Sequence, residues 1–224
     1  FQCETYTGGG ANSTVTFSGN SNLQPDLLWI KSRSSGYDHN IFDTNRGIAK
    51  LLEPSQTNVE NTNQTWISNV SSDSFTIGVN EHNLSNTSNN FVAWAWKANG
   101  GTTSSNTVGD INSTVQVNST AGLSIVSYTG NFTATQTVGH GLGVTPDLVI
   151  IKNRDTAVDW VVWSPLLSSG NFLRLNTNAA QSSSSRIYQS GFTTTTFGIG
   201  ANNSVNKSGD DLIAYCFAEK QGYS

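Results

Sequence analysis

The residues best suited to ligand chemistry are two tryptophans that follow a polar turn. Trp160 and Trp163 flank two valines after the turn 155–159, and the alternation of a strand places their indoles on opposite faces. We therefore expect one indole in the core and the other exposed. An exposed indole beside amide and carboxylate side chains can hold a sugar, with its ring face against apolar C–H groups. The alternative is that both tryptophans pack at the interface of the two repeats described below.

Two charged residues complete this candidate ligand-binding site. Asp159 ends the polar turn before Trp160, and Arg154 follows an apolar strand. Arg154 has a counterpart, Arg33, earlier in the chain, which is consistent with ligand contact at the strand end. The alternative for the repeated arginines is an ion pair with a neighbouring strand, with Asp43 as a candidate partner in the first copy.

The cysteines and histidines predict no metal site and no cofactor. His39, His82 and His140 fall in three separate loops, and the two cysteines are far apart, so no ligand spacing is recognisable. Cys3 lies in the first expected strand and Cys216 in the last. Because terminal strands are often adjacent, a disulfide between them is one alternative; two buried free thiols are the other.

No motif of nucleotide binding or hydrolysis is convincing. The glycine-rich segment 139–143 has G-x-G-x-G spacing and precedes a strand instead of a helix, so we expect a turn with a half-exposed His140. No G-x-S-x-G elbow is present. The acidic residues that repeat are Asp26 and Asp147, each directly after a proline, a position that caps a turn. We therefore expect no catalytic residues.

The composition excludes several classes of protein. The net charge is −4, only 12% of residues are charged, and the chain holds 30 Ser, 26 Thr, 26 Asn and 21 Gly. This neutral polarity argues against nucleic-acid binding, which needs clustered Lys and Arg. The apolar runs, such as Phe91–Trp96, are far too short to span a bilayer, so we expect no insertion into a membrane. The chain starts at Phe1 and contains no Met, which we interpret as processing, trimming or excision from a longer polypeptide.

The chain repeats itself at an offset of about 121 residues. A Tyr-Thr-Gly triplet, a Pro-Asp block, a Phe-Thr block and an alternating apolar block recur in the same order. We conclude that the molecule is a tandem duplication. The matching segments are 6–8 with 128–130, 25–33 with 146–154, 73–76 with 190–193, and 91–96 with 212–217.

Each copy has the pattern of an all-β fold. Segment 91–96 alternates bulky and small residues, and we expect its bulky face in the core. Segment 148–151 is apolar on both faces, which is typical of a central strand. Helix signals are poor, and the one candidate, 48–53, is too short to stand alone. The sequence predicts two tandem antiparallel β-sandwiches, jelly-roll-like, over 1–98 and 119–224. Between them, 99–118 is predicted to be a polar linker, with a short strand at 113–117.

The second copy resembles a repeat found in the virion proteins of marine tailed phages, a domain whose function is uncharacterised. The segments that carry the resemblance are 128–131, 138–143, 146–154, 213–219 and 222–224. The first copy departs from it, since 16–23 replaces the His-Gly-Leu-Gly turn and 94–97 replaces the Tyr-Cys-Phe-Ala stretch. The resemblance implies an extracellular, assembled, adhesive β-protein and supplies no catalytic residues.

These observations favour a non-enzymatic protein of the virion surface: a tail fibre, a spike or a capsid decoration. Its expected partners are copies of itself, other virion proteins and a host-surface glycan. Amides and hydroxyls on a weakly charged surface suit such contacts. A secreted carbohydrate-binding or adhesin module of a cellular organism is the first alternative, and a polysaccharide-degrading enzyme is the second.

Overall fold

The computed structural model describes residues 1–79 and 83–222 of the chain. Two compact units are present. The first comprises Phe1–Gln56 and Glu60–Gly101, and the second comprises Thr57–Val59 and Thr102–Ser224. Strands dominate both units, and the two short helices found among these described residues lie in the second unit.

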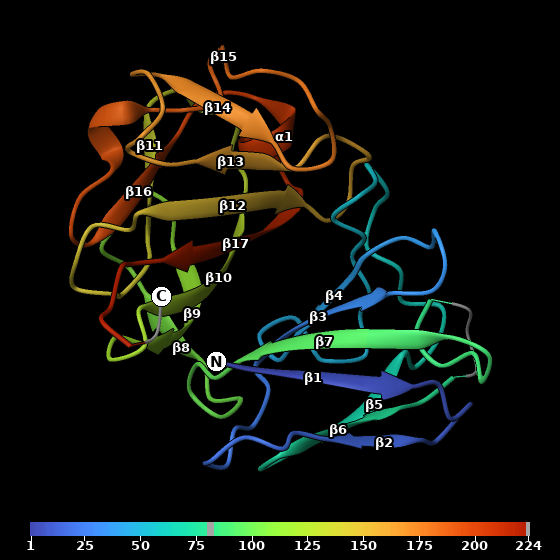
Figure 1. Ribbon diagram of the computed structural model, residues 1–224. Coiled ribbons are helices and arrows are strands. Elements are labelled where there is room, and N and C mark those ends of the chain that lie inside the picture. Colours follow the sequence, from blue (N-terminus) through green and yellow to red (C-terminus); the bar gives the residue numbers. More distant parts are fainter. Residues whose placement is uncertain (80–82, 223–224) are drawn as a thin grey trace. The chain divides into compact units, whose positions relative to one another are not determined.

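The first unit consists of two antiparallel sheets that lie face to face (Figure 1). The four-stranded sheet has the order β1-β7-β3-β4, and the three-stranded sheet has the order β2-β6-β5. Apolar side chains from both sheets form one core cluster. The strands are β1 (Gln2–Thr7), β2 (Thr14–Thr16), β3 (Leu27–Ser32), β4 (Asn40–Asp43), β5 (Ile67–Ser71), β6 (Ser74–Ile77) and β7 (Asn90–Trp96).

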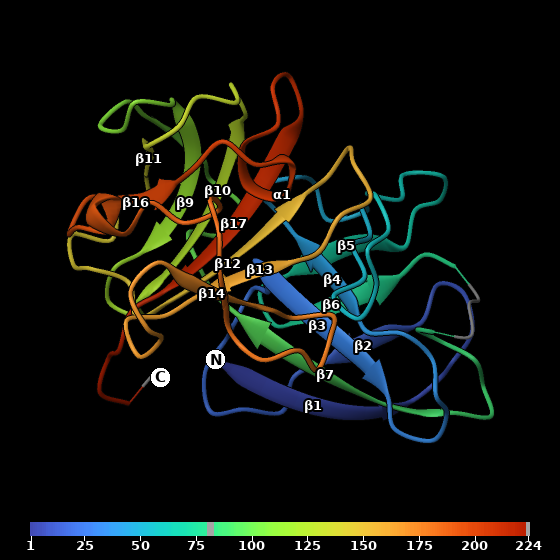
Figure 2. The same ribbon diagram turned by 90° about the horizontal axis from the view of Figure 1, so that it is seen from above.

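The second unit pairs an eight-stranded sheet with a two-stranded one. The large sheet has the order β15-β14-β13-β12-β17-β10-β9-β8, and Figure 2 shows its central strands side by side. The small sheet is β11-β16. The elements are β8 (Ser104–Asn106), β9 (Ser113–Asn118), β10 (Leu123–Thr129), β11 (Gln136–Gly139), β12 (Leu148–Asn153), β13 (Val161–Trp163), β14 (Asn171–Arg174), β15 (Ser182–Ser183), η1 (Gln189–Gly191), β16 (Thr196–Ile199), α1 (Asn203–Asn206) and β17 (Asp211–Phe217).

The strand order repeats between the two units. The sheet β1-β7-β3-β4 corresponds to the stretch β10-β17-β12-β13 of the large sheet, and the pair β2-β6 corresponds to β11-β16. All these pairings are antiparallel. The duplication read from the sequence is therefore also a duplication of topology, and the predicted all-β antiparallel sandwich architecture is confirmed.

The segment predicted to be a linker belongs largely to the second unit. Strands β8 and β9 pair with each other, and β9 pairs with β10, so both extend the large sheet at its edge. The short strand expected at 113–117 is present as β9. The strand β8 was not predicted, because its Ser and Asn residues have no apolar face and form a strand through backbone pairing alone.

The prediction that the bulky face of segment 91–96 lies in the core is wrong. In β7 the small residues Ala93 and Ala95 belong to the core cluster together with Phe91, whereas Trp94 and Trp96 lie on the opposite, outer face. Aromatic residues of the facing sheet, such as Phe75, belong to the same core cluster as these alanines. A small face in a central strand therefore marks the side against which a second sheet packs closely.

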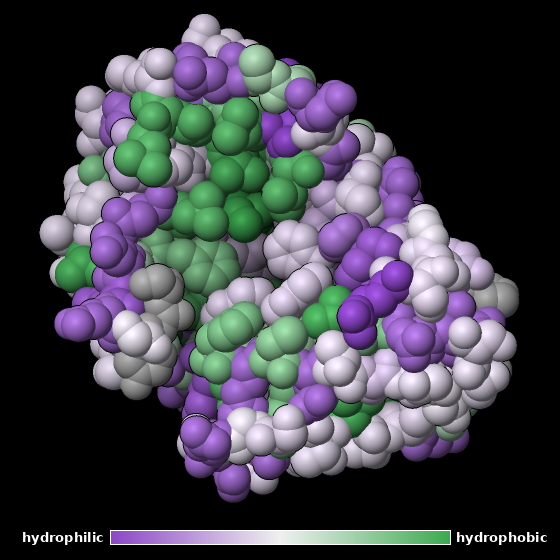
Figure 3. Space-filling view, viewed as in Figure 1, coloured by the Kyte–Doolittle hydropathy of each residue, from purple (hydrophilic) through white to green (hydrophobic). Residues whose placement is uncertain are grey.

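The outer face of the second unit's sheet is apolar as well. Cross-strand pairing aligns Leu173, Val162, Ile150, Tyr215 and Ile125 in one row across five strands. Figure 3 shows apolar residues, in green, gathered over β12, β13 and β14. The prediction that segment 148–151 is apolar on both faces and central in its sheet is confirmed by β12, which lies between β13 and β17.

The Tyr-Thr-Gly triplet has the same structural role in both units. The hydroxyl of Tyr6 donates to the carbonyl of Leu84 at 2.9 Å, and the hydroxyl of Tyr128 donates to the carbonyl of Val205 at 2.7 Å. Each contact ties the first strand of a repeat to the loop before its last strand. The glycine of the triplet lets the chain pass that loop, since a Cβ on Gly130 would overlap a backbone carbonyl. The repeated triplet is thus explained by packing.

Candidate functional site

The two tryptophans singled out from the sequence are both buried. Trp160 is 0% exposed and Trp163 is 2% exposed, so the expectation of one exposed indole is wrong. Trp163 belongs to the core cluster of the second unit and stacks on Phe192 with centroids 3.5 Å apart. Its indole N–H donates to Oε1 of Gln189 at 3.1 Å. These indoles stabilise the fold and offer no open ring face for a sugar.

The charged residues near the tryptophans are held by strand contacts. Asp159 accepts from Nε of Arg174 at 2.9 Å and from the amide of Asn176 at 3.0 Å. Arg154 lies 3.5 Å from a carboxylate oxygen of Asp211 on the neighbouring strand β17. The ion-pair alternative for Arg154 is therefore observed. The expected partner in the first copy, Asp43, pairs with a different arginine.

The structure does place Arg154 in a pocket, though with different neighbours from those expected. This pocket of the second unit has a volume of about 240 Å³ and a lining that is mainly polar. Hydroxyl side chains from three adjacent strands contribute, because register aligns Ser105, Thr114 and Ser127 across β8, β9 and β10. The lining residues are Ser105, Asn112, Ser113, Thr114, Ser127, Tyr128, Thr129, Arg154 and Asp211.

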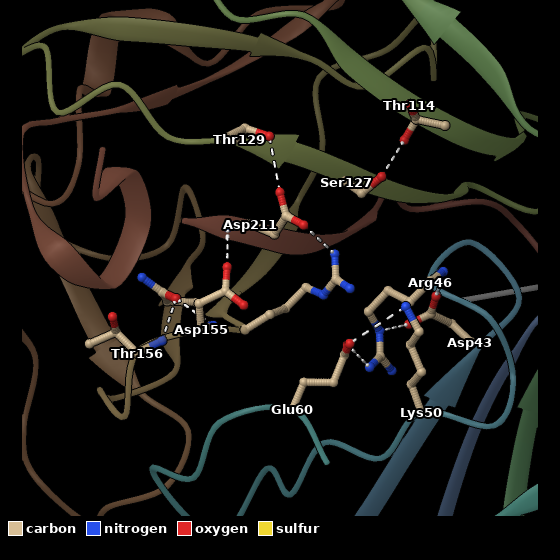
Figure 4. Close-up of polar contacts among 12 residues, drawn as sticks. Asp43, Arg46, Lys50, Glu60, Thr114, Ser127, Thr129, Asp155, Thr156 and Asp211 are labelled. Atoms are coloured by element: carbon tan, nitrogen blue, oxygen red, sulfur yellow. Dashed lines mark hydrogen bonds and ion pairs between the residues drawn. The ribbon is translucent and has the colours of Figure 1, made fainter. Parts of the chain in front are cut away.

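Asp211 organises one side of this hydroxyl-lined pocket (Figure 4). One carboxylate oxygen accepts from the hydroxyl of Thr129 at 3.0 Å, and the other lies 3.5 Å from the guanidinium of Arg154. The backbone N–H of Asp211 donates to Oδ2 of Asp155 at 2.6 Å. About half of the Asp211 side chain remains exposed, at 53%. The pocket therefore presents a carboxylate, a guanidinium and several hydroxyls at fixed positions.

The first unit contains the same arrangement with an uncharged amide in place of the carboxylate. The hydroxyl of Thr7 meets Oδ1 of Asn90 at 3.0 Å, as Thr129 meets Asp211. The backbone N–H of Arg33 donates to the carbonyl of Asn90 at 2.7 Å, matching the contact from Arg154 to Asp211 at 2.9 Å. Because an amide replaces the carboxylate at position 90, the arginine–carboxylate pair belongs to the second unit alone. The two copies have diverged at this site.

Figure 4 also shows a buried ion network in the first unit. Arg46 contacts Asp43 at 2.6 Å and Glu60 at 2.8 Å, and Lys50 lies 3.8 Å from Glu60. The side chains of Arg46 and Asp43 are 0% exposed. Their charges are satisfied by each other, which is the ordinary condition for buried ions. We infer that this network stabilises the loop that follows β4.

His140 is buried and neutral instead of half-exposed. Its Nδ1 accepts from the N–H of Leu142 at 3.1 Å, and Nε2 lies 3.3 Å from the carbonyl of Thr193. Burial lowers the pKa of His140, which keeps the ring neutral. His140 is thus a structural element of its turn. His82 lies outside the described residues.

The two cysteines are free thiols in different units. Cys3 lies on β1 and is exposed, and Cys216 lies on β17 and is buried. The disulfide alternative is therefore wrong, and the alternative of two buried thiols holds for Cys216 alone. Cys3 lies on an edge strand of the first unit's sheet and Cys216 on a central strand of the second unit's sheet, so the two strands are not paired with each other.

Among the described residues, no group of three or more His, Cys, Asp or Glu side chains could hold a metal ion. Within the same part of the chain, no helix has the length and apolarity needed to cross a membrane.

Comparison with known proteins gives one match. A family model described as a domain of unknown function (DUF7483) matches residues 1–224. The chain belongs to the DUF7483 family. The matched range spans both units, so the DUF7483 model covers the duplicated pair. The search of curated proteins and the search of solved structures found no match.

The hydroxyl-lined pocket shows what sequence reasoning missed. Of its lining residues, sequence patterns had singled out Arg154 and, within the repeated triplet, Tyr128 and Thr129. The other serines and threonines that β8, β9 and β10 contribute to this lining carry no motif, and they share a pocket because strand register aligns them. One sequence feature could have pointed to this pocket: Asn90 of the first copy is replaced by the charged Asp211 in the second.

Proposed function

We propose that the protein is a non-enzymatic component of a virion surface that attaches to a host-surface glycan through the hydroxyl-lined pocket of its second unit. The observation that carries the proposal is the lining of that pocket. Ser, Thr and Asn side chains surround one guanidinium and one carboxylate within about 240 Å³. Sugars present hydroxyls that both donate and accept, and side chains of these types match them.

Charge supports binding in preference to hydrolysis. Among the lining residues of the pocket, Asp211 is the single acid, and it contacts Thr129 and Arg154. Glycosidases ordinarily use two carboxyl groups on either side of the scissile bond. A pocket with one paired carboxylate is suited to hydrogen bonding with hydroxyls. The guanidinium additionally suits acidic sugars, because it donates paired hydrogen bonds to carboxylates.

The location on a virion surface rests on the resemblance of the second repeat and on composition. A chain with 12% charged residues and abundant Ser, Thr and Asn presents amides and hydroxyls with little charge. Such a surface limits nonspecific charge binding.

The test is binding of the purified protein to a glycan array and to host cells, with its assembly state measured by size-exclusion chromatography and light scattering. Arg154→Gln and Ser127→Ala should lower the apparent affinity about tenfold, the equivalent of about 1.4 kcal/mol. Arg33→Gln, at the equivalent position of the first unit, is the matched control and should leave binding unchanged. A strict monomer that binds neither glycans nor cells would refute the proposal.

A second assay separates binding from catalysis. The protein is incubated with envelope polysaccharide from the host, and reducing ends are measured over time. We expect no release. Steady release would favour the enzyme alternative over an attachment protein.

A further inference from the structure

The first unit carries an aromatic pocket on the outer face of its four-stranded sheet. The pocket has a volume of about 320 Å³, near the lower end of the range for small-molecule sites. Its lining is almost wholly apolar and comprises Phe1, Trp29, His39, Trp94 and Trp96. We refer to these five residues as the indole pocket.

Strand register brings the three indoles together. Trp29 on β3 pairs directly with Trp94 on β7, and Trp96 follows two residues later on the same face. All three side chains are partly exposed, in contrast to Trp160 and Trp163 of the second unit. The sheet therefore presents a continuous surface of indole rings.

Neighbouring aromatic groups hold the rings of Trp29 and Trp96 in place. The indole N–H of Trp29 donates to Nδ1 of His39 at 2.9 Å, and the two rings meet edge to face with centroids 5.9 Å apart. The ring of Trp96 packs against Phe1 with centroids 5.0 Å apart. Rings that are already oriented lose little entropy when a ligand settles on them.

The electrostatics of the indole pocket favour a neutral ligand. None of its five lining residues is acidic. Burial and the nearby charge of Lys31 lower the pKa of His39, against a smaller opposite effect of Asp38, so the imidazole is neutral at physiological pH. Because Nδ1 of His39 accepts from Trp29, the ring proton of the neutral form is on Nε2. The charge of Lys31 also disfavours a quaternary ammonium, which aromatic cages otherwise bind.

The fold does not require these indoles. The equivalent positions of the second unit hold Ile150, Tyr215 and Phe217, and that unit forms the same four-strand arrangement. Packing of the sandwich therefore accepts other apolar residues at all three positions. The concentration of tryptophan in one copy needs a reason besides stability.

We infer that the indole pocket binds the pyranose ring of a neutral sugar, with the C–H face of the sugar stacked on the indoles of Trp29, Trp94 and Trp96. A pyranose chair has an apolar face of C–H groups, which the negative face of an indole attracts. The choice of a sugar as ligand rests on the proposed function. The pocket itself is independent of the hydroxyl-lined pocket, which lies in the other unit and is polar.

The experiment uses the full chain labelled with 5-fluorotryptophan and followed by fluorine NMR. Maltose, cellobiose and lactose are titrated as neutral probes, with tetramethylammonium as the cationic probe. We expect the disaccharides to shift the resonances of Trp29, Trp94 and Trp96, and to leave those of the buried Trp160 and Trp163 in place. Single Trp→Phe variants assign the resonances.

A triple variant, called the swap variant, tests whether the three indoles bind sugar, and it uses residues that the same fold accepts in the second unit. Trp29→Ile, Trp94→Tyr and Trp96→Phe together install the residues of the second unit, and saturation-transfer NMR with unlabelled protein measures sugar binding. We expect affinity to fall by up to about tenfold, because Trp29→Ile removes one aromatic contact worth about 0.5–1.5 kcal/mol and the other two changes replace indoles with smaller rings. Arg33→Gln, which lies outside the lining of both pockets, is the control and should bind these sugars normally.

The outcomes separate this inference from the proposed attachment function. Shifts at the three indoles without binding to a glycan array or host cells would support the indole pocket and count against attachment. Array binding without those shifts would overturn the indole pocket alone. Shifts caused by tetramethylammonium and by none of the sugars, or unchanged affinity in the swap variant, would also overturn it.

Discussion

The carboxylate of Asp26 should be one of the strongest single stabilising groups of the first unit. It is 0% exposed, and it accepts three backbone hydrogen bonds from Ala98, Gly100 and Gly101, each at 2.8 Å. The hydroxyl of Thr44 donates a fourth at 3.0 Å. The carboxylate thus closes the loop that follows β7, and its removal by Asp26→Ala leaves these donors without an acceptor.

The expected loss follows from the burial of the donors. A donor left unsatisfied in a buried site costs about 1–3 kcal/mol. The N–H of Ala98 is buried, while those of Gly100 and Gly101 are part-buried and can recover some water. We therefore expect Asp26→Ala to lower the free energy of unfolding of the first unit by about 4 kcal/mol, of which Ala98 accounts for about half.

The duplication provides a matched control for this prediction. Asp147 follows a proline at the equivalent position, but it is exposed and accepts a single backbone hydrogen bond, from Glu219 at 2.7 Å. Asp147→Ala should cost only about 0.5–1.5 kcal/mol, the net value of one ordinary hydrogen bond. The sequence alone makes the two aspartates look equivalent, so the difference between them depends on the structure.

Urea denaturation followed by tryptophan fluorescence gives the unfolding free energies, and amide hydrogen exchange reports on the loop directly. In Asp26→Ala the amides of Ala98, Gly100 and Gly101 should exchange faster than in the wild type, and Asp147→Ala should leave them unchanged. Equal losses of stability in the two variants, or unchanged exchange in Asp26→Ala, would show that the buried hydrogen bonds do not carry the stability assigned to them.

Three further predictions concern a histidine, a glycine and the thiols. Burial lowers the pKa of His140 in the folded chain, so the unfolded chain takes up a proton first as the pH falls. The free energy of unfolding should therefore decrease below about pH 6.5. Urea unfolding at about pH 7.5 and about pH 5.5 should show a smaller difference in stability for His140→Gln than for the wild type. Gly130→Ala should lower the free energy of unfolding by about 3 kcal/mol or more, because the new Cβ would overlap the carbonyl of Lys207. Gly143→Ala should lower it by about 1–2 kcal/mol in thermal unfolding, since Gly143 has a φ of 75° but open space around it. Similar losses of stability in the two variants would contradict the overlap. A thiol reagent should label Cys3 alone in the folded chain and Cys216 as well in denaturant, and a reductant should leave the unfolding midpoint unchanged; a midpoint that falls in reductant would indicate a bridge.

The sequence was informative wherever local pattern and repetition were enough. Alternation identified strands such as 91–96, and the constant offset between copies identified the duplication, because equivalent residues keep equivalent strand positions. The repeated aspartates were predicted to cap turns, but their backbone donors are distant in sequence: Asp26 accepts from Ala98, and Asp147 accepts from Glu219. Only the fold brings these segments to the start of the strand.

Site prediction from the sequence was less successful, because pocket lining depends on register. Trp160 and Trp163 were placed on opposite faces by alternation, yet both are buried, since one face of β13 is packed in the sandwich core and the other is also covered. The hydroxyl-lined pocket joins segments from 105 to 211, and the indole pocket joins segments from 1 to 96. No spacing along the chain encodes these neighbours.

The sequence by itself determined the all-β class, the copying of one sandwich and the neutral polar surface, because period, offset and composition are properties of the chain. The tertiary structure alone decided which face of each strand lies in the core. Alternation separates the two faces of a strand without naming them, and only the sheet packed opposite selects the inner one. That choice placed the alanines of β7 inside and its indoles outside, and the indole pocket exists as a result.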